Sequence, residues 1–400
     1  MKILYYHQHF STPNGSTGTR SYEFAKKLLE KGHTVTMICG SYWIADTGLS
    51  GSFNKGKRCG FVDGINVIEF DLNYSNADNF MKRSLIFLQY SWRGIKMALE
   101  KDYDILFATS TPLTAGIPGI FAKVFRKKPF IFEVRDLWPE LPKAMGVITN
   151  PIVLKLMGIL ETLSYKFSSA CIGLSPGIVK GIKKKVPHKH TILIPNGCDM
   201  DLIQLNEDKI KNEKYTAIFT GAHGFANGLD AVLDAAKILI QKKETDIEIQ
   251  FIGDGILKPK LELRVINEGI KNCTFEPPMP KRELFLHLKK HADIGLMILD
   301  NIPEFYYGTS PNKFFDYIAL GIPVFINYPG WLADLIEKNN CGVVVEPNNP
   351  VEFANALIKM KNKSILNQKG RNAKKLAESN FDRKNLSIKF VKYLENTIQI

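Results

Sequence analysis

Short apolar segments rich in β-branched residues alternate with amphipathic stretches along the first half of the chain. This pattern predicts strands separated by helices, the first helix running from about Arg20 to Lys31. The predicted strands are Lys2–Tyr6, Thr34–Cys39, Ile65–Phe70, Ile105–Ala108, Phe130–Val134, Ala170–Leu174 and Thr191–Ile194. Alternation of this kind is typical of a parallel sheet covered by helices on both faces, so we expect an α/β fold.

The same pattern restarts near Tyr215. Six further strands are predicted at Ala217–Thr220, Glu248–Ile252, Thr274–Glu276, Ile294–Met297, Pro323–Ile326 and Gly342–Val345. The helices between them are predicted at Leu229–Gln241, Arg282–Lys289 and Lys313–Ala319, and the segment Arg371–Ile400 is helical and basic. Because 400 residues exceed what one core usually supports, we expect two doubly wound domains joined around Pro195–Asn206.

Positive charge is concentrated in the first half of the chain. Residues 1–200 carry 26 Lys and Arg against 15 Asp and Glu, and residues 201–400 carry 27 against 25. Such an excess favours a phosphate-bearing substrate or an acidic membrane as partner, although solvated lysines are the alternative. No recognition motif of the usual DNA or RNA modules is present, so no nucleic-acid partner is expected.

Cysteine usage and hydropathy indicate the compartment. The six cysteines have no paired spacing, which argues against a disulfide framework or a zinc site and favours a reducing cytosol. The N-terminus shows no cleavage signal, and no stretch of 18 apolar residues occurs, so we expect no membrane span.

Glycine-rich loops follow strands in both halves, where ligands of parallel sheets bind. In the loop Ser11–Gly18, Gly15 and Gly18 would let backbone N–H groups approach an anion, and Arg20 favours a functional role over a flexible turn. In the second half, the loop from Phe219 to Gly228 could cradle a diphosphate. Its candidate residues are Gly221, His223 and Gly224.

Two further segments bring lysines to strand ends. Lys258 follows Phe251-Ile-Gly-Asp-Gly, where it could neutralise a leaving diphosphate, or simply be solvated. At the start of the helix after Gly308, the backbone and Lys313 would meet phosphates, while Asp316, one turn later, could accept hydrogen bonds from vicinal hydroxyls. A purely structural capping role for Ser310 and Asp316 is the alternative.

The order and spacing of these motifs resemble the family 4 retaining glycosyltransferases of GT-B fold. The bacterial branch that builds O-antigen and capsule chains, with L-fucosamine and N-acetylhexosamine transferases, is the most similar. The resemblance rests on GHTVTMI, VRDLWPE, IPNG, TGAHGFANG, FIGDG and SPNKFFDYIALGIPVF. It implies two Rossmann-like domains that face a central cleft: residues 1–198 for the acceptor and 199–375 for the nucleotide sugar. A C-terminal helix, at about 376–400, would cross back to the first domain.

The resemblance also implies a set of donor contacts. Gly221 and its loop, Lys258, Ser310, Asn312 and Lys313 would surround the diphosphate of a UDP-sugar, Asp316 would hold the ribose, and the base would lie against the 276–280 backbone. The family often carries a second acidic residue eight positions before the position of Asp316. Gly308 stands there, which leaves the identity of the donor sugar open.

The segment VRDLWPE supplies the catalytic candidates. Many relatives place a histidine near the end of this strand, and here Arg135 stands there. The resemblance would set Arg135, Asp136 and Glu140 near the transferring sugar and the acceptor hydroxyl. A buried Arg135–Asp136 ion pair that fixes the loop is the structural alternative.

The resemblance implies a retaining transfer of a sugar, expected to be an N-acetylated amino sugar, from UDP to a polyprenyl-diphosphate-linked saccharide. No cofactor or metal is expected, because lysines and helix N-termini can stabilise the leaving group. The basic, apolar segments 80–99 and 152–167 suit peripheral binding to the inner face of an anionic cytoplasmic membrane, or are buried helices. The alternative functions are a two-Rossmann nucleotide-sugar epimerase and a non-catalytic basic binding protein.

Overall fold

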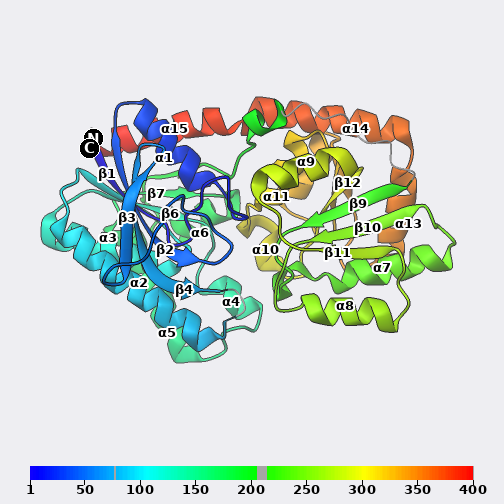
Figure 1. Ribbon diagram of the computed structural model, residues 1–400, viewed down its shortest axis with the longest axis horizontal. Helices are drawn as coiled ribbons and strands as arrows, with labels where there is room; N and C mark the ends of the chain where they lie inside the picture. Colours follow the sequence, from blue (N-terminus) through cyan, green and yellow to red (C-terminus); the bar gives the residue numbers. More distant parts are fainter. Residues whose placement is uncertain (76–77, 205–213, 400) are drawn as a thin grey trace. The chain divides into compact units, whose positions relative to one another are not determined.

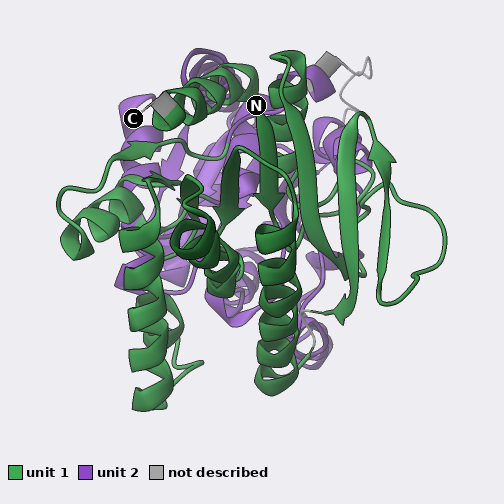
Figure 2. Cartoon of the chain, turned by 90° about the vertical axis from the view of Figure 1, so that its left-hand side faces the viewer, with its two compact units in different colours: residues 1–196, 308–310, 383–400 green, residues 197–307, 311–382 purple. Residues whose placement is uncertain are grey.

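A computed structural model describes residues 1–75, 78–204 and 214–399, which fall into two compact units (Figures 1 and 2). Unit 1 comprises residues 1–196, 308–310 and 383–400, and unit 2 comprises residues 197–307 and 311–382. The expected junction around Pro195–Asn206 extends to positions 205 and 206, which lie outside the described residues, as does Ile400.

Unit 1 is built on an eight-stranded sheet in the order β3-β4-β2-β1-β5-β6-β7-β8. Its strands are β1 (Lys2–Tyr6), β2 (Thr34–Tyr42), β3 (Lys57–Val62), β4 (Ile65–Tyr74), β5 (Ile105–Thr109), β6 (Phe130–Val134), β7 (Ala170–Gly173) and β8 (Thr191–Leu193). All neighbouring strands are parallel except β3 and β4, which form an antiparallel pair. The sequence prediction missed β3, because this edge strand is largely exposed and has no apolar run.

Helices cover both faces of this sheet (Figure 1). One face carries α1 (Arg20–Glu30) and α15 (Arg383–Gln399), which pack together through stacked Phe24 and Phe390 rings 4.3 Å apart. The other carries α2 (Phe80–Glu100), α3 (Gly116–Arg126), α5 (Pro151–Phe167) and α6 (Pro176–Lys185), and the short α4 (Glu140–Ala144) follows β6. Asn79, Asn150 and Ser175 cap α2, α5 and α6 with their side chains.

Unit 2 contains a six-stranded parallel sheet in the order β11-β10-β9-β12-β13-β14. Its strands are β9 (Tyr215–Thr220), β10 (Ile247–Ile252), β11 (Cys273–Glu276), β12 (Ile294–Met297), β13 (Val324–Ile326) and β14 (Gly342–Val344). Its helices are α7 (Asp230–Gln241), α8 (Lys258–Asn267), α9 (Lys281–His291), α10 (Pro303–Gly308), α11 (Asn312–Ala319), α12 (Trp331–Lys338), α13 (Pro350–Met360) and α14 (Lys363–Leu376).

The predicted α/β class with two Rossmann-like parallel sheets is therefore confirmed. The basic C-terminal segment is not one helix, because a π-helical turn at Ala377–Phe381 separates α14 in unit 2 from α15 in unit 1. No helix within the described residues is long and apolar enough to cross a membrane.

Candidate active site

The Gly-rich loops of unit 2 meet at the carboxyl ends of β9, β10 and β11. The Gly221 N–H donates to Ile252 O over 2.9 Å, and the Gly253 N–H donates to Glu276 O over 3.1 Å. A β carbon on Gly253, whose φ is +149°, would lie 1.9 Å from Gly221 O, so only glycine allows the loops to approach this closely. These loops place backbone groups of three strand ends side by side.

Lys313, in the first turn of α11, extends over the Gly221 loop. Its Nζ lies 3.7 Å from the centroid of the Phe219 ring and donates to Asn227 Oδ1 over 3.3 Å. A β carbon on Gly221 would lie 3.4 Å from this Nζ. Burial lowers the pKa of Lys313 to about 7. Among the described residues, the contacts of this amine are the Phe219 ring and the Asn227 amide oxygen, which carry no charge. An anionic ligand would therefore stabilise its charged form.

Lys258, at the start of α8, links the second loop to the end of β11. Its Nζ donates to Gly253 O over 3.1 Å and to Glu276 O over 3.0 Å. The amine is half-buried beside the strand ends, as expected for a lysine near a diphosphate, but its hydrogen bonds here are to the backbone.

His223 lies beneath the Gly221 loop, with Gly224 following it at a partly exposed position. The imidazole is fully buried among the rings of Phe219, Phe251 and Phe275, and neither ring nitrogen has a hydrogen-bond partner in the part of the chain that the structure describes. Burial, reinforced by Lys258 and Lys313, lowers the pKa of His223 to about 4. The backbone of His223 connects the two loops by bonding to Asp254 O and Leu257 N.

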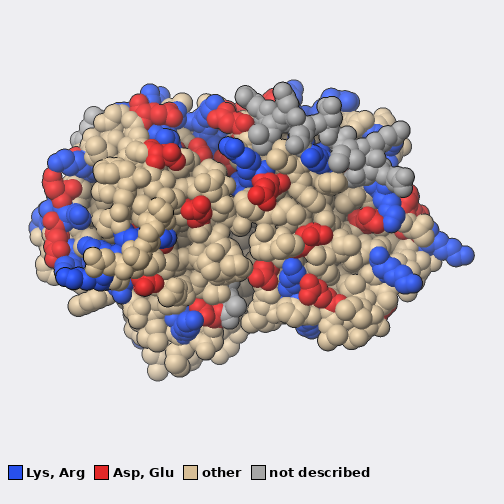
Figure 3. Space-filling view, viewed as in Figure 1, with Lys and Arg blue, Asp and Glu red and all other residues tan. Residues whose placement is uncertain are grey.

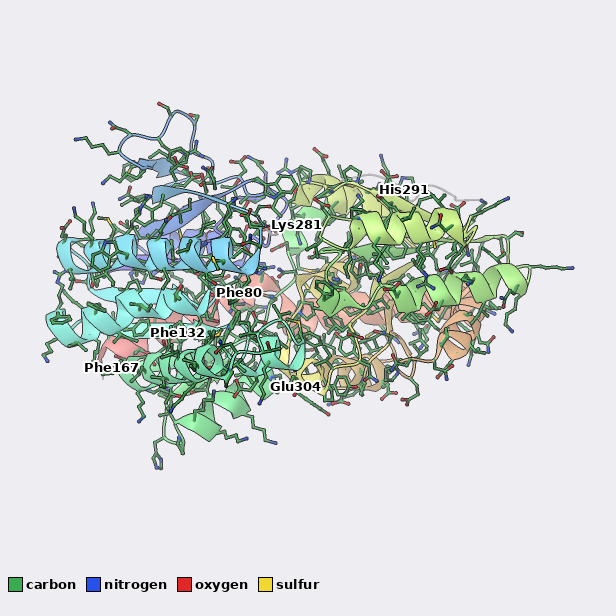
Figure 4. The ribbon with its side chains drawn as sticks, turned by 90° about the horizontal axis from the view of Figure 1, so that it is seen from below. Phe80, Phe132, Phe167, Lys281, His291 and Glu304 are labelled. Carbon is green, nitrogen blue, oxygen red and sulfur yellow. The ribbon has the colours of Figure 1, made fainter. Side chains whose placement is uncertain are left out.

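Asp316 is only 4% exposed and forms a buried ion pair with Lys281. Lys281 opens α9, directly after the 276–280 segment expected to face the base (Figure 4). Its Nζ lies 3.9 Å from Asp199 Oδ2. Sequence reasoning missed Lys281, and the available signal was a lysine following Pro280 at a helix start. Asp316 therefore has an ionic partner that its local motif did not reveal.

The two other candidate residues near the start of α11, Ser310 and Asn312, belong to different units. Ser310 is buried in unit 1, where its Oγ accepts from the Asn196 N–H over 3.1 Å and its carbonyl accepts from Asn196 Nδ2 over 2.6 Å. Asn312 is the first residue of α11 in unit 2 and is partly exposed.

In unit 1, the loop Ser11–Gly18 is held by hydrogen bonds within the loop and to the segment after β2. The Gly15 N–H donates to Thr12 O and the Ser16 N–H donates to Ile44 O, while Gly18 lies further along, before α1. A β carbon on Gly15 would lie 2.2 Å from Ser11 Oγ. Glycine at this position is therefore required by close packing.

Arg20 is 1% exposed and makes four hydrogen bonds inside unit 1. Two go to Glu133 Oε2, over 3.0 and 2.7 Å, and two go to the carbonyls of Ile194 and Pro195. Glu133 also accepts from Thr109 Oγ1. This buried ion pair holds α1 against β6 and the end of β8. The Arg20 guanidinium therefore has a structural partner at the position where we expected it to help bind an anionic ligand.

The VRDLWPE segment is fixed by interactions other than an Arg135–Asp136 pair. Arg135 Nη1 lies 3.1 Å from His7 Nε2, and the Arg135 N–H donates to Ser110 Oγ. Asp136 is half-buried, and burial raises its pKa while Arg135 opposes the rise. Glu140 is exposed and pairs with Lys185 over 3.0 Å.

Lys185 also pairs with buried Glu161, whose Oε1 accepts from the Trp138 N–H over 2.9 Å. This network from α5 and α6 anchors the loop after β6. No local sequence pattern indicates this network, because the residues that it pairs lie more than 20 positions apart.

Each half of the chain matches a family of known proteins. Residues 15–197 match the model of the glycosyl transferase 4-like domain, and residues 203–377 match that of glycosyl transferases group 1. The chain is a glycosyltransferase. The matches to transferase families in both halves favour sugar transfer over the epimerase and binding-protein alternatives.

Solved structures show the same GT-B fold at low sequence identity. Sucrose-phosphate synthase from Thermosynechococcus elongatus has a TM-score of 0.77 at 14% identity, covering 99% of this chain and 98% of that one. HepE from Anabaena in complex with UDP-glucose has a TM-score of 0.68 at 15% identity, covering 99% and 100%. WaaG, a glycosyltransferase involved in lipopolysaccharide biosynthesis, has a TM-score of 0.67 at 15% identity, covering 97% and 98%. No curated protein sequence matches the glycosyltransferase.

Proposed function

We propose that this glycosyltransferase moves a sugar, with retention of its anomeric configuration, from UDP to a polyprenyl-diphosphate-linked saccharide in bacterial surface-polysaccharide synthesis. The observation that carries the proposal is the convergence of the Gly221 and Gly253 loops with Lys258 and Lys313 in unit 2. The UDP-glucose complex of HepE supports the donor class. An N-acetylated amino sugar is the proposed group transferred.

Unit 2 offers what a diphosphate requires without a resident metal. Lys313 has a lowered pKa in the free protein, and an adjacent diphosphate would restore its charge. Lys258 and the N-terminus of α11 add further donors. Asp316, held by Lys281, is proposed to accept from the ribose hydroxyls. We propose that these groups stabilise the leaving UDP.

The proposed reaction is a front-face substitution. The bond from the anomeric carbon to the UDP oxygen breaks, the acceptor hydroxyl attacks from the same side, and its proton passes to the departing phosphate. Arg135 and Asp136 are proposed to orient the acceptor hydroxyl. Glu140, held by Lys185, is proposed to position the loop that carries them. The contribution of the protein is orientation and charge stabilisation.

An apolar face on unit 1 supports the membrane part of the proposal. Helices α2, α3 and α5 lie side by side, and Figure 4 shows Phe80 and Phe167 near opposite ends of this layer. Its outer surface exposes large apolar side chains at helical spacing: Met81, Leu85, Leu88 and Trp92 of α2, Phe125 of α3, and Ile152, Leu156, Ile159 and Leu163 of α5. Exposed apolar surface of this extent is rare on proteins that remain in water.

Basic residues border this face. Lys82 and Lys96 are exposed on α2, and in Figure 3 Lys and Arg side chains gather around α3 while the surface over α5 is largely uncharged. Two other basic residues of the 80–99 segment, Arg83 and Arg93, turn inward: Arg83 lies over the Tyr74 ring, and Arg93 donates to Gly56 O. The proposed contact with an anionic leaflet therefore rests on apolar side chains and the exposed lysines.

The donor proposal is tested by thermal shift with nucleotides and nucleotide sugars in EDTA. UDP and UDP-N-acetylhexosamines should raise the unfolding temperature, and ATP and NAD should not, because ligands stabilise the folded state that binds them. Lys313→Ala should weaken UDP binding about 10- to 100-fold, the equivalent of one charged hydrogen bond. No shift with any UDP compound would refute the donor class.

The membrane proposal is tested by cosedimentation with vesicles that contain phosphatidylglycerol. Leu88→Glu together with Trp92→Glu should release the protein, since each removes an exposed apolar side chain and adds a negative charge. The matched control is Leu263→Glu with Ile266→Glu, which alters equally exposed apolar residues on α8 of unit 2. Equal vesicle binding by both double variants would contradict the proposed face.

A further inference from the structure

Three consecutive residues after β1 carry buried polar atoms that have no hydrogen-bond partner among the described residues. His7 is 3% exposed and Gln8 is 1% exposed. The unpaired atoms are His7 Nδ1, both amide atoms of Gln8, and His9 Nδ1. We call these three residues the β1 polar cluster. Leaving a buried amide unpaired is costly, so buried polar groups in proteins almost always have partners.

The surroundings of the cluster combine positive charge with aromatic rings. Arg135 contacts His7, and Arg83, whose Nε is also buried and unpaired, lies 5.8 Å from the Tyr74 ring. The imidazole of His9 packs against the rings of Tyr42, Tyr74 and Phe87. Burial, reinforced by Arg135 and Arg83, lowers the pKa of His9 to about 3, and burial also lowers the pKa of His7. Both imidazoles are therefore neutral at pH 7.

The contact with Arg135 fixes which hydrogen bonds remain open. A guanidinium can only donate, so His7 Nε2 accepts from it and the ring proton lies on Nδ1. The cluster then offers unpaired donors on His7 Nδ1 and Gln8 Nε2, and an unpaired acceptor on Gln8 Oε1. A carboxylate or a dianionic phosphate monoester could satisfy the donors but has no proton to donate to Oε1. Sugar hydroxyls both donate and accept, and sugar ring faces pack on aromatic side chains.

We propose that the β1 polar cluster is a binding site for a neutral sugar, the terminal residue of the acceptor saccharide, with Gln8 as its specificity-determining residue. The proposal rests on the proposed function, since it assigns the acceptor of that transfer. It places recognition of the acceptor on uncharged groups at the carboxyl end of β1, in the same unit as the apolar face.

The test replaces Gln8 with methionine, which has a similar volume but no polar amide. If the only role of the Gln8 side-chain amide is to bind a ligand, Gln8→Met should raise the thermal unfolding midpoint of the free protein. The substitution removes an unpaired buried polar group. Gln89→Met is the matched control, because Gln89 is exposed on α2 of the same unit and should change neither stability nor binding.

Binding is measured on the full chain by calorimetry with octyl glycosides of glucose, galactose, N-acetylglucosamine and N-acetylgalactosamine, and with octyl phosphate as the anionic probe. At least one glycoside should bind, and Gln8→Met should weaken it 10-fold or more while UDP binds as before. A lower unfolding midpoint in Gln8→Met, unchanged glycoside affinity, no binding by any glycoside, or preference for octyl phosphate would each overturn the proposal. If the unaltered chain does not bind UDP, that result refutes the donor assignment and not the acceptor proposal.

Discussion

At the residue scale, the side chains that bear charge in this glycosyltransferase divide into paired and unpaired groups. Arg20 and Glu133 compensate each other inside unit 1, so removing either would leave a buried charge. Lys313 differs, because its amine contacts an aromatic ring and an amide oxygen and its pKa is lowered. A buried amine without a carboxylate is expected where the charge partner is a ligand.

The lowered pKa of Lys313 predicts that the protein takes up a proton when it binds UDP. The free amine, with a pKa of about 7, is mostly neutral at pH 8.5, and a bound diphosphate would raise its pKa and recharge it. Calorimetry at pH 8.5 in two buffers of different ionisation enthalpy should show uptake of nearly one proton per UDP, and UDP affinity should fall as pH rises above 7. Lys313→Arg stays charged and should show neither effect; equal uptake in that variant would exclude Lys313 as the source.

At the element scale, single ionic contacts join helices that are distant in sequence. Lys281 at the start of α9 and Asp316 in α11 form such a contact, 35 residues apart. The pair lies between the end of β11 and the start of α11, the elements expected to surround the nucleoside. It can therefore serve both the packing of unit 2 and the presentation of the Asp316 carboxylate.

The two roles of this pair can be separated by substitution. Lys281→Met alone should destabilise the protein by about 3–5 kcal/mol in urea unfolding, because Asp316 loses its buried partner. Adding Asp316→Leu should recover most of that stability, since apolar pairs often replace buried ion pairs at little cost. UDP affinity should stay low in the double variant. Recovery of UDP affinity together with stability would mean that Asp316 does not contact the nucleotide.

At the scale of the whole molecule, charge and apolar surface are unevenly distributed. The net charge of +13 comes mostly from residues 1–200, and the exposed apolar face on α2, α3 and α5 belongs to the same unit. Unit 2 instead carries the Gly-rich loops and Lys313. Membrane and donor functions are therefore proposed for different units.

The positive charge of unit 1 predicts that binding to anionic vesicles depends on the salt concentration. Raising KCl from about 0.1 M to about 1 M shortens the Debye length from about 10 Å to about 3 Å. Binding to phosphatidylglycerol vesicles should weaken at least 10-fold, while the fraction that remains should depend on Trp92 and its apolar neighbours. Cosedimentation across a salt series measures this, and vesicle binding that is insensitive to salt would exclude an electrostatic contribution from unit 1.

The sequence by itself determined the two parallel sheets and the loops that follow their strands. Strands buried on both faces form continuous apolar runs, and a close approach of backbone requires glycine, so both are visible locally in segments such as Phe130–Val134 and at Gly253. It also predicted the position of Lys313 at a helix start. These features depend on neighbouring residues along the chain.

Only the tertiary structure decided which partner each polar side chain has. Lys281 was found beside Asp316, Glu133 beside Arg20, and Arg93 was turned away from the surface that its helix exposes. It also added the antiparallel edge strand β3, and it left four side-chain atoms of the β1 polar cluster without hydrogen-bond partners among the described residues. The physical reason is that hydrophobic periodicity reports which positions are buried, whereas ionic and hydrogen-bond partners are set by packing between segments far apart in the chain.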